Sequence, residues 1–213
     1  MNGTIKRIIL IVVVFVVLLC SDRIINAKPK KPVMVLAGSS TIRRWKSTKK
    51  IFKDYKVINT ALGGSTVTQW FDLYKDRIID YKPDVLVFYC GANDMQDGNP
   101  ETGAVNGTDN AQNTIRLLSL IRTICKNTKI IYIGINHCNR NPHIWDQIDI
   151  SNNIMKNICN KYKNMYYIDI IDKLLINNIP DDRLFEYDQL HLNKSGYKVW
   201  NKYIGKYIKS ILK

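Results

Sequence analysis

The feature that most constrains the fold is a set of short apolar runs in which hydrophobic and polar residues do not alternate. The clearest runs are Val33–Ala37, Asp84–Cys90 and Lys129–Ile135. Shorter stretches at Lys56–Asn59 and Met165–Ile170 complete the set. A strand without alternation is covered on both faces, which is typical of parallel sheets. The chain is therefore expected to form five buried parallel strands.

Segments with helical character separate these runs. We expect helices over Ile42–Phe52, Val67–Tyr81, Ala111–Cys125, Asp149–Tyr162 and Lys194–Ile211. The segment Leu174–Tyr187 is expected to be irregular. The alternation predicts the α/β class: a three-layer α/β/α sandwich around a five-stranded parallel sheet. The carboxyl ends of the strands are then the expected place for a functional site. We find no repeat and no linker, so residues 28–213 are expected to form one domain.

The net positive charge of the chain favours an anionic partner but identifies no specific one. The chain has 213 residues, 46% of them hydrophobic, and a formal net charge of +14. Such a charge favours anionic surroundings such as lipid or polysaccharide surfaces. The lysines are scattered, and no basic run is interleaved with aromatics, so no specific nucleic-acid partner is predicted. A solvated basic surface is the plainer interpretation, and the pattern leaves the oligomeric state open.

Residues 1–27 have the layout of a secretory signal peptide. Lys6 and Arg7 precede an unbroken apolar run, Ile8–Cys20, and small or polar residues follow as far as Ala27. The run is short for a membrane span, which needs about 17–25 residues. An uncleaved signal anchor is the alternative. We therefore expect a secreted or extracytoplasmic protein.

Export implies an oxidising compartment, so the cysteines matter. The four that follow Cys20 match no zinc-binding spacing: Cys90, Cys125, Cys138 and Cys159. Buried free thiols are the plainer interpretation, and the sequence leaves their disulfide state open. A metal site at His137 and His143, which flank Cys138, is a further possibility. No carboxylate lies there at ligand spacing, so solvent-facing loop histidines are the favoured interpretation.

Polar residues suited to nucleophilic catalysis follow successive strands. Ser40 follows the first strand, Gly64 the second and Asn93 the third, and Asp188 and His191 precede the last helix. A serine needs an adjacent base, a histidine base needs an orienting carboxylate, and the developing oxyanion needs hydrogen-bond donors. Each residue alone is more simply a cap or a turn residue. Their joint occurrence in this order favours a catalytic site.

These blocks resemble the SGNH hydrolases, also called GDSL-type esterases and lipases. The four blocks of that family correspond to Gly38-Ser39-Ser40, Gly64, Gly91-Ala92-Asn93-Asp94 and Asp188-Gln189-Leu190-His191. Gly38–Trp45 also resembles a subgroup with the pattern Gly-Ser-Ser-Ser/Thr-Ile-Arg-x-Trp. That subgroup is similar to platelet-activating-factor acetylhydrolase-like esterases. The resemblance spans about residues 33–205.

The resemblance implies a flavodoxin-like fold and a role for each matching residue. Ser40 would be the nucleophile, His191 its base and Asp188 the group that orients His191. The backbone N–H groups of Ser40 and Gly64 and the side chain of Asn93 would form the oxyanion hole. The family implies no metal and no cofactor.

The resulting hypothesis is an exported serine ester hydrolase that works through an acyl-enzyme. A short acyl group, such as acetyl on a glycan or lipid, is the expected substrate. A lysophospholipase or thioesterase of the same fold is one alternative, and a non-catalytic secreted protein that binds anionic surfaces is another. Two departures from the family pattern stand out: Ser39 replaces the usual aspartate, and Ala61 replaces a frequent glycine.

Overall fold

The computed structural model describes residues 30–96 and 104–212. The expected signal segment, 1–27, lies outside the described residues. The chain divides into residues 1–31 and a compact unit of residues 32–213, which carries every described helix and strand. Within the described ranges, no helix combines the length and the apolar character needed to cross a bilayer.

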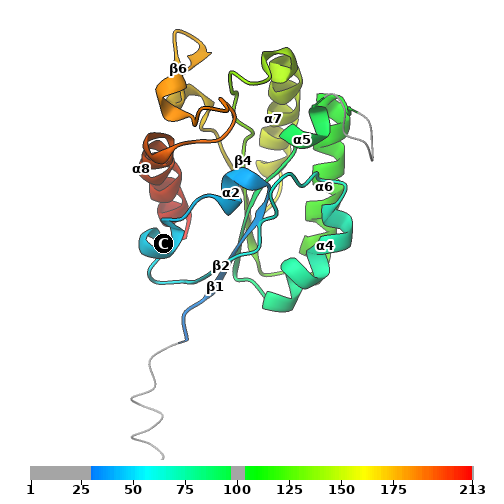
Figure 1. Cartoon of the computed structure of the whole chain (residues 1–213). Coiled ribbons are helices and arrows are strands. Elements are labelled where there is room, and N and C mark those ends of the chain that lie inside the picture. Colours follow the sequence, from blue (N-terminus) through cyan, green and yellow to red (C-terminus); the bar gives the residue numbers. More distant parts are fainter. Residues whose placement is uncertain (1–29, 97–103, 213) are drawn as a thin grey trace, which may run out of the picture. The chain divides into compact units, whose positions relative to one another are not determined.

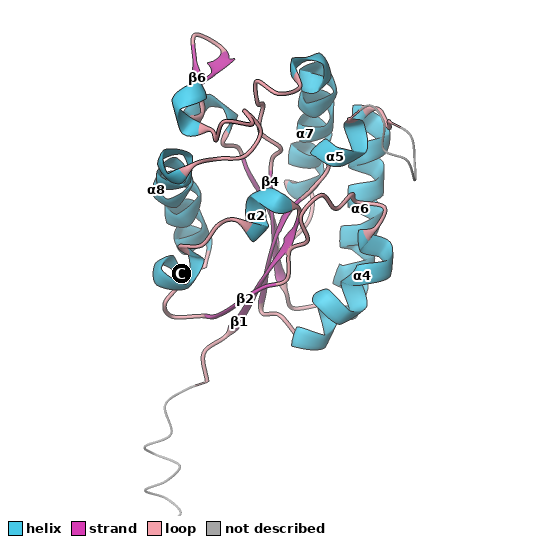
Figure 2. Ribbon diagram, in the orientation of Figure 1, coloured by secondary structure: helices cyan, strands magenta, loops and turns pink. Residues whose placement is uncertain are grey.

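A five-stranded parallel sheet forms the centre of the unit (Figure 2). Its strands are β1 (Val33–Gly38), β2 (Lys56–Asn59), β3 (Val85–Tyr89), β4 (Lys129–Ile133) and β5 (Met165–Ile168). They pair in the order β2-β1-β3-β4-β5, with every pair parallel. Every residue of β3 is buried, as the absence of alternation predicts. The predicted three-layer fold is confirmed.

Helices cover both faces of the sheet (Figure 1). The α-helices are α2 (Ser40–Arg43), α3 (Thr48–Ile51), α4 (Trp70–Arg77), α5 (Ala92–Met95), α6 (Gly107–Ile124), α7 (Trp145–Cys159) and α8 (Lys194–Ile211). The described residues also contain four 3-10 turns: η1 (Ile79–Tyr81), η2 (Pro142–Ile144), η3 (Ile171–Lys173) and η4 (Asp182–Leu184). On one face, Trp200 of α8 packs edge-on against Trp45, with ring centroids 5.4 Å apart. On the other face, Trp70 of α4 and Leu118 of α6 join a second buried cluster.

Two predicted helices are shorter than their periodicity suggests. The helix expected over 42–52 breaks into α2 and α3, because Trp45 turns inward and donates from its ring N–H to Asn201 Oδ1 at 2.7 Å. The helix expected from Val67 begins only at Trp70. Residues 67–69 form a tighter turn, in which the Trp70 N–H donates to the carbonyl oxygen three residues back, that of Val67, at 3.1 Å. The Val67 N–H itself donates to the Asp94 carboxylate at 2.9 Å.

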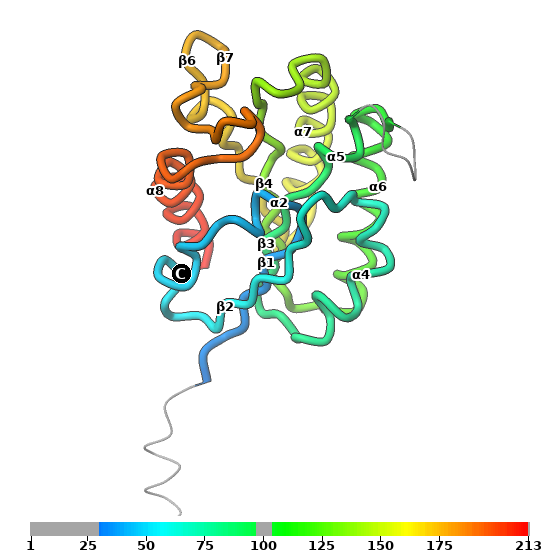
Figure 3. The backbone as a smooth tube through the Cα atoms, in the orientation of Figure 1, coloured from blue at the N-terminus to red at the C-terminus, as the bar shows by residue number. Residues whose placement is uncertain are grey.

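Two other boundaries differ in the opposite direction. Helix α6 begins at Gly107, four residues earlier than expected, because the Asn106 side chain caps it by accepting from the Asp109 N–H. The segment 174–187, expected to be irregular, contains a hairpin of β6 (Leu175–Ile176) and β7 (Ile179–Pro180), seen at the top of Figure 3. Helix α7, like α6, begins earlier than predicted: it starts at Trp145, four residues before the expected Asp149.

The strand order determines where a site can form. The chain reverses its direction of winding between β1 and β3, and open α/β sheets bind ligands at such a switch point. Ser40 follows β1 and Asn93 follows β3, so both lie at the carboxyl edge beside this point.

Candidate active site

The turn after β1 is tight because Gly38 lies against the neighbouring strand. Gly38 has φ +124°, and a Cβ atom there would stand 1.9 Å from the Tyr89 carbonyl oxygen. That oxygen accepts from the Ser39 N–H at 2.9 Å. Only glycine fits this backbone, and the chain leaves it directly into α2 with Ser40 as the first helical residue. Ser40 is thereby presented at the sheet edge, partly exposed.

A continuous hydrogen-bonded chain joins Ser40 to two residues far away in the sequence. His191 Nε2 lies 2.9 Å from Ser40 Oγ. His191 Nδ1 lies 2.6 Å from Asp188 Oδ2. Because a carboxylate only accepts, Nδ1 carries the proton, and Nε2 is left to accept from the serine hydroxyl. The structure thus brings together all three residues that the sequence singled out as nucleophile, base and orienting group.

The segment between Asp188 and His191 is a turn built around the carboxylate. Asp188 Oδ1 accepts from the N–H groups of Leu190 and His191 at 3.0 and 2.9 Å. Partial burial raises the pKa of Asp188, but these bonds and the His191 ring outweigh it and lower that pKa to about 2. Asp188 is therefore ionised throughout the physiological range, as an orienting carboxylate must be.

A second loop supports this turn, and sequence reasoning missed it. Gln189 has φ +53°, an uncommon conformation for a non-glycine residue. The Arg140 N–H donates to the Gln189 carbonyl oxygen at 3.1 Å, and Asn139 Nδ2 donates to Gln189 Oε1 at 3.2 Å. The loop after β4 therefore holds the backbone that carries Asp188 and His191. No motif marks Asn139, so no signal in the sequence could have found it.

The expected oxyanion donors face the same region. In the described part of the chain, no acceptor takes the N–H of Ser40 or of Gly64. Asn93 donates one of its two amide hydrogens to the Ser65 carbonyl oxygen at 2.9 Å. Its other amide hydrogen is available to a ligand, since an amide NH₂ has two donors.

Ser65 connects the nucleophile turn with this donor and is a second residue that sequence reasoning missed. Its hydroxyl donates to the Gly38 carbonyl oxygen at 3.2 Å and accepts from Trp70 Nε1 at 3.0 Å. Its own carbonyl oxygen accepts from Asn93. Ser65 is 1% exposed, so the network is shielded from water. Its place directly after Gly63-Gly64 was the available signal.

The neighbouring Asp94 fastens the same loop to the turn after β3. Its carboxylate is buried and accepts from the Val67 N–H. Burial raises the pKa of Asp94 to about 6, although hydrogen bonds from the Val67 and Thr68 backbones oppose the shift.

One cavity contains the groups described above. Its volume is about 440 Å³, and it is lined by Ser40, Arg43, Arg44, Lys46, Gly63, Gly64, Asn93, Leu190 and His191. Among the described residues that line it, Leu190 alone has an aliphatic side chain. All the expected oxyanion residues and both ends of the serine–histidine pair therefore border one space.

The loop histidines do not gather into a metal site. His137 is buried rather than solvent-facing, which corrects the favoured sequence interpretation for this residue. Its Nε2 lies 2.9 Å from Asp149 Oδ1, and its ring stacks on Trp145. His143 is exposed. Among residues 30–96 and 104–212, no cluster of three or more potential ligands is arranged to hold a metal ion.

The cysteines are free thiols in the described structure. Cys90, Cys138 and Cys159 are buried as expected, whereas Cys125 is only partly buried. Cys90 lies at the end of β3, where its thiol donates to the Ser65 carbonyl oxygen at 3.3 Å.

Comparison with known proteins identifies the family. The sequence model of the GDSL-like lipase/acylhydrolase family matches residues 36–199, which is more than half of the chain. The chain therefore belongs to the GDSL-like lipase/acylhydrolase family, whose members are esterases and acylhydrolases. A comparison with curated protein sequences found no match.

Solved structures show the same fold. A Bacteroides fragilis protein provisionally described as an acylhydrolase has a TM-score of 0.72 at 22% identity, over 88% of this chain and 94% of that one. A Streptococcus pneumoniae protein provisionally described as a platelet activating factor has a TM-score of 0.70 at 15% identity, over 86% of both chains. A catalytic mutant of an acetylxylan esterase from Geobacillus stearothermophilus has a TM-score of 0.66 at 15% identity, over 85% and 96%.

Proposed function

We propose that this protein is a serine ester hydrolase that acts through an acyl-enzyme. The observation that carries the proposal is the hydrogen-bonded chain from Asp188 through His191 to Ser40. Ser40 Oγ attacks the ester carbonyl carbon while His191 Nε2 takes the hydroxyl proton. His191 then returns that proton to the alkoxide that leaves, and the acyl group stays on Ser40 as an ester.

Water completes the cycle. His191 takes a proton from a water molecule, whose oxygen attacks the acyl carbonyl carbon, and the bond to Ser40 Oγ breaks as the serine regains a proton. In both tetrahedral intermediates the negative oxygen accepts from the N–H groups of Ser40 and Gly64 and from the unpaired amide hydrogen of Asn93. Such donors are each worth about 10²–10³-fold in rate. Asp188 holds the imidazole in the required tautomer and stabilises its charged form.

The cavity supports a short acyl group. In the part of the lining that the structure describes, Leu190 is the only aliphatic side chain, and the other residues are polar or glycine. A long acyl chain would have to leave its apolar surface in contact with water or with charged groups, at about 25 cal/mol per Å². The acetylxylan esterases among the structural neighbours remove such a group, and we propose acetyl on a glycan for this chain.

The location of this activity is a separate proposal that rests on the composition of residues 1–27. An apolar run behind two basic residues directs a chain to export, and cleavage near Ala27 would release the catalytic unit. Amino-terminal sequencing of the protein recovered from a secreting host tests it: a start after Ala27 or Ser21 supports export with cleavage, and an intact Met1 supports an anchor.

Hydrolysis of p-nitrophenyl acetate tests the enzymatic proposal. The variant Ser40→Ala is expected to lose about 10³-fold or more of kcat/KM. Ser39→Ala is the matched control, because the buried Ser39 side chain makes no capping bond and does not line the cavity. It is expected to stay within about tenfold of the wild type. Equal rates for wild type and Ser40→Ala would refute the mechanism.

Chain length separates the proposal from its rival within the family. The rate on p-nitrophenyl esters is expected to fall steadily from the two-carbon to the eight-carbon acid. A rising rate would favour a lysophospholipase or thioesterase in place of an acetylesterase.

A further inference from the structure

Cations dominate the cavity that holds Ser40 and His191. Arg43, Arg44 and Lys46 all line it, and none of the described residues that line it carries a carboxylate. All three cations are exposed. In the described ranges, the ion pairs of the chain do not involve any of them. Three positive charges, none of them ion-paired within the described residues, therefore border the cavity of the reacting serine.

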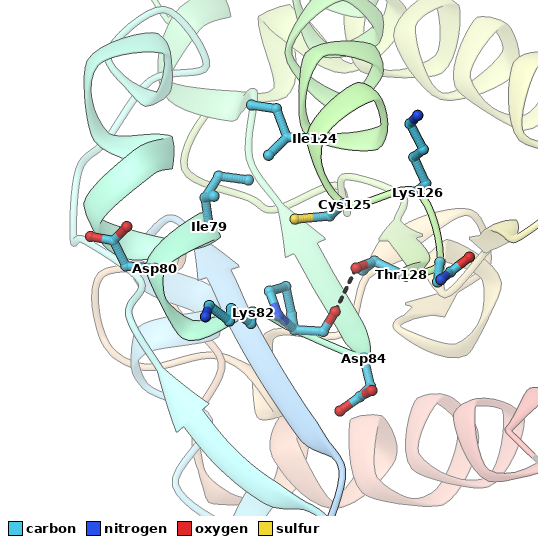
Figure 4. A pocket seen from close by; sticks show the side chains of 10 residues that line it. Ile79, Asp80, Lys82, Asp84, Ile124, Cys125, Lys126 and Thr128 are labelled. Carbon is cyan, nitrogen blue, oxygen red and sulfur yellow. Dashed lines mark hydrogen bonds between the residues drawn. The ribbon is translucent and has the colours of Figure 1, made fainter.

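The general basic surplus of the chain does not account for this clustering. At the opposite edge of the sheet, a cavity of about 590 Å³ lies at the start of β3 and β4 (Figure 4). Lys82 and Lys126 line it together with Asp80 and Asp84, so its charges balance. The same basic chain thus forms a cavity with no net charge at that edge of the sheet.

Two smaller cavities show the same mixture. Lys209 and Asp54 border the one beside α3, where the two charges cancel. Lys156 and Lys173 border the other together with Asp169. Of these four cavities in the described part of the chain, only the one at Ser40 combines three cations with no carboxylate.

Local geometry directs these cations at the site. Arg43 is three residues after Ser40 on the single turn of α2, so the two side chains share one face of that turn. A Cβ atom on Gly63 would stand 2.8 Å from Arg43 Nη1. The guanidinium therefore lies against Gly63, the residue that precedes Gly64 in the expected oxyanion loop. The bare glycine is what lets the charge approach the expected oxyanion loop.

We propose that this cluster binds an anionic group on the alcohol part of the ester, so that the substrate is a short-chain acyl ester of an acidic glycan. The proposal rests on the proposed esterase function. The planar fork of an arginine matches a carboxylate or phosphate with two parallel bonds. The acyl part is short and uncharged, so the anion belongs to the alcohol. In a glycan it is a carboxylate or phosphate on the acetylated sugar or its neighbour.

A matched pair of chromogenic esters measures the preference. The anionic probe is 3-carboxy-4-nitrophenyl acetate, and the neutral probe is 3-carbamoyl-4-nitrophenyl acetate. Both release a nitrophenolate, and they differ in one charge on the leaving group. The quantity compared is the ratio of kcat/KM for the two probes, corrected for their rates in buffer. We expect wild type to favour the anionic probe by about tenfold at low salt, and 0.5 M NaCl to lower the ratio because ions screen exposed charges.

Two triple variants separate the cluster from the overall charge. One carries Arg43→Gln, Arg44→Gln and Lys46→Gln, and its ratio is expected to fall to about one. The other carries Lys49→Gln, Lys50→Gln and Lys56→Gln, exposed lysines that do not line the cavity, and it is expected to keep the wild-type ratio. Both lose three positive charges, so long-range attraction falls equally in the two.

Acetate release from natural polymers completes the test. Wild type is expected to deacetylate O-acetylated polygalacturonate faster than O-acetylated xylan of equal acetyl content. A ratio near one in wild type, an equal fall in both triple variants, or a preference for xylan would overturn the acidic-glycan proposal while leaving the esterase intact. Absence of Ser40-dependent hydrolysis of either probe would instead overturn the proposed function itself.

Discussion

Replacing Ser65 with alanine is expected to destabilise the protein far more than the loss of one hydroxyl suggests. The Ser65 hydroxyl is the hydrogen-bond partner of Trp70 Nε1, and the indole is fully buried. Without it, the indole N–H has no partner and no access to water. An unsatisfied buried donor costs about 1–3 kcal/mol, and the bond to the Gly38 carbonyl adds about 0.5–1.5 kcal/mol. The Gly38 oxygen keeps a second donor, the Leu62 N–H at 2.9 Å. Losing the bond from Ser65 should therefore cost an amount near the low end of that second range.

The free energy of unfolding should therefore fall by about 2–3 kcal/mol in Ser65→Ala. Urea denaturation measures it, and at about 2–4 °C per kcal/mol for a domain of this size the melting temperature should fall by about 4–12 °C. A double-mutant cycle with Trp70→Phe isolates the donor. The double variant should be about 1–2 kcal/mol more stable than the two single effects predict, because it contains no orphaned N–H. A coupling energy of zero would refute the argument, whatever the cost of each single substitution.

Three further predictions concern the same region. Asn93→Ala should lower kcat on p-nitrophenyl acetate by about 10²–10³-fold, since an oxyanion donor is removed, with little change in KM. Gly38→Ala should prevent folding to the native state, as circular dichroism would show, because the new Cβ would overlap the Tyr89 carbonyl. Gly64→Ala has open space around it but a φ of +78°, so it should lower the free energy of unfolding by only about 1–2 kcal/mol. Asp94 has a pKa of about 6 when folded against an ordinary 3.8, so its folded form binds the proton more tightly and stability should fall as pH rises through this interval. Relative to Asp94→Asn, the wild type should lose about 3 kcal/mol between pH 3.5 and 7 in urea titrations, at about 1.36 kcal/mol for each pH unit of the shift; a constant difference would contradict the shift.

The strands were predictable because burial on both faces leaves a direct mark on the sequence. Val85–Tyr89 is entirely apolar, and each of its residues is buried. Helix boundaries were less predictable, because partners distant in the sequence determine them. Nothing near Trp45 announces that its ring N–H will donate to Asn201 of α8 and that the predicted helix will break there. A local cap helped in one case and not in another: the predicted start of α8 after Asn193 agrees with the structure, whereas the cap at Asn106 before α6 was missed.

The candidate site also contains residues that the sequence predicts and residues that it does not. Residues that perform chemistry are few in type, so Ser40, Asp188 and His191 could be proposed from their kinds and their order, although 151 positions separate the serine from the histidine. Their roles stay predictions until the variants are measured. Supporting residues carry no such mark: the contact between Asn139 and Gln189 joins two loops through ordinary polar side chains.

The error in the first predicted helix bears on the substrate. A single helix over 42–52 would distribute its five basic residues around the axis at about 100° steps. The actual chain ends α2 at Arg43 and buries Trp45, which leaves Arg43, Arg44 and Lys46 on the cavity while Lys49 and Lys50 belong to α3. The indole that breaks the helix is held by Asn201 of α8, so a contact made 156 residues away separates the cations at the serine from those on the outer surface. A net charge counted over the whole sequence cannot distinguish the two groups, which is why the inference about an anionic substrate required the structure.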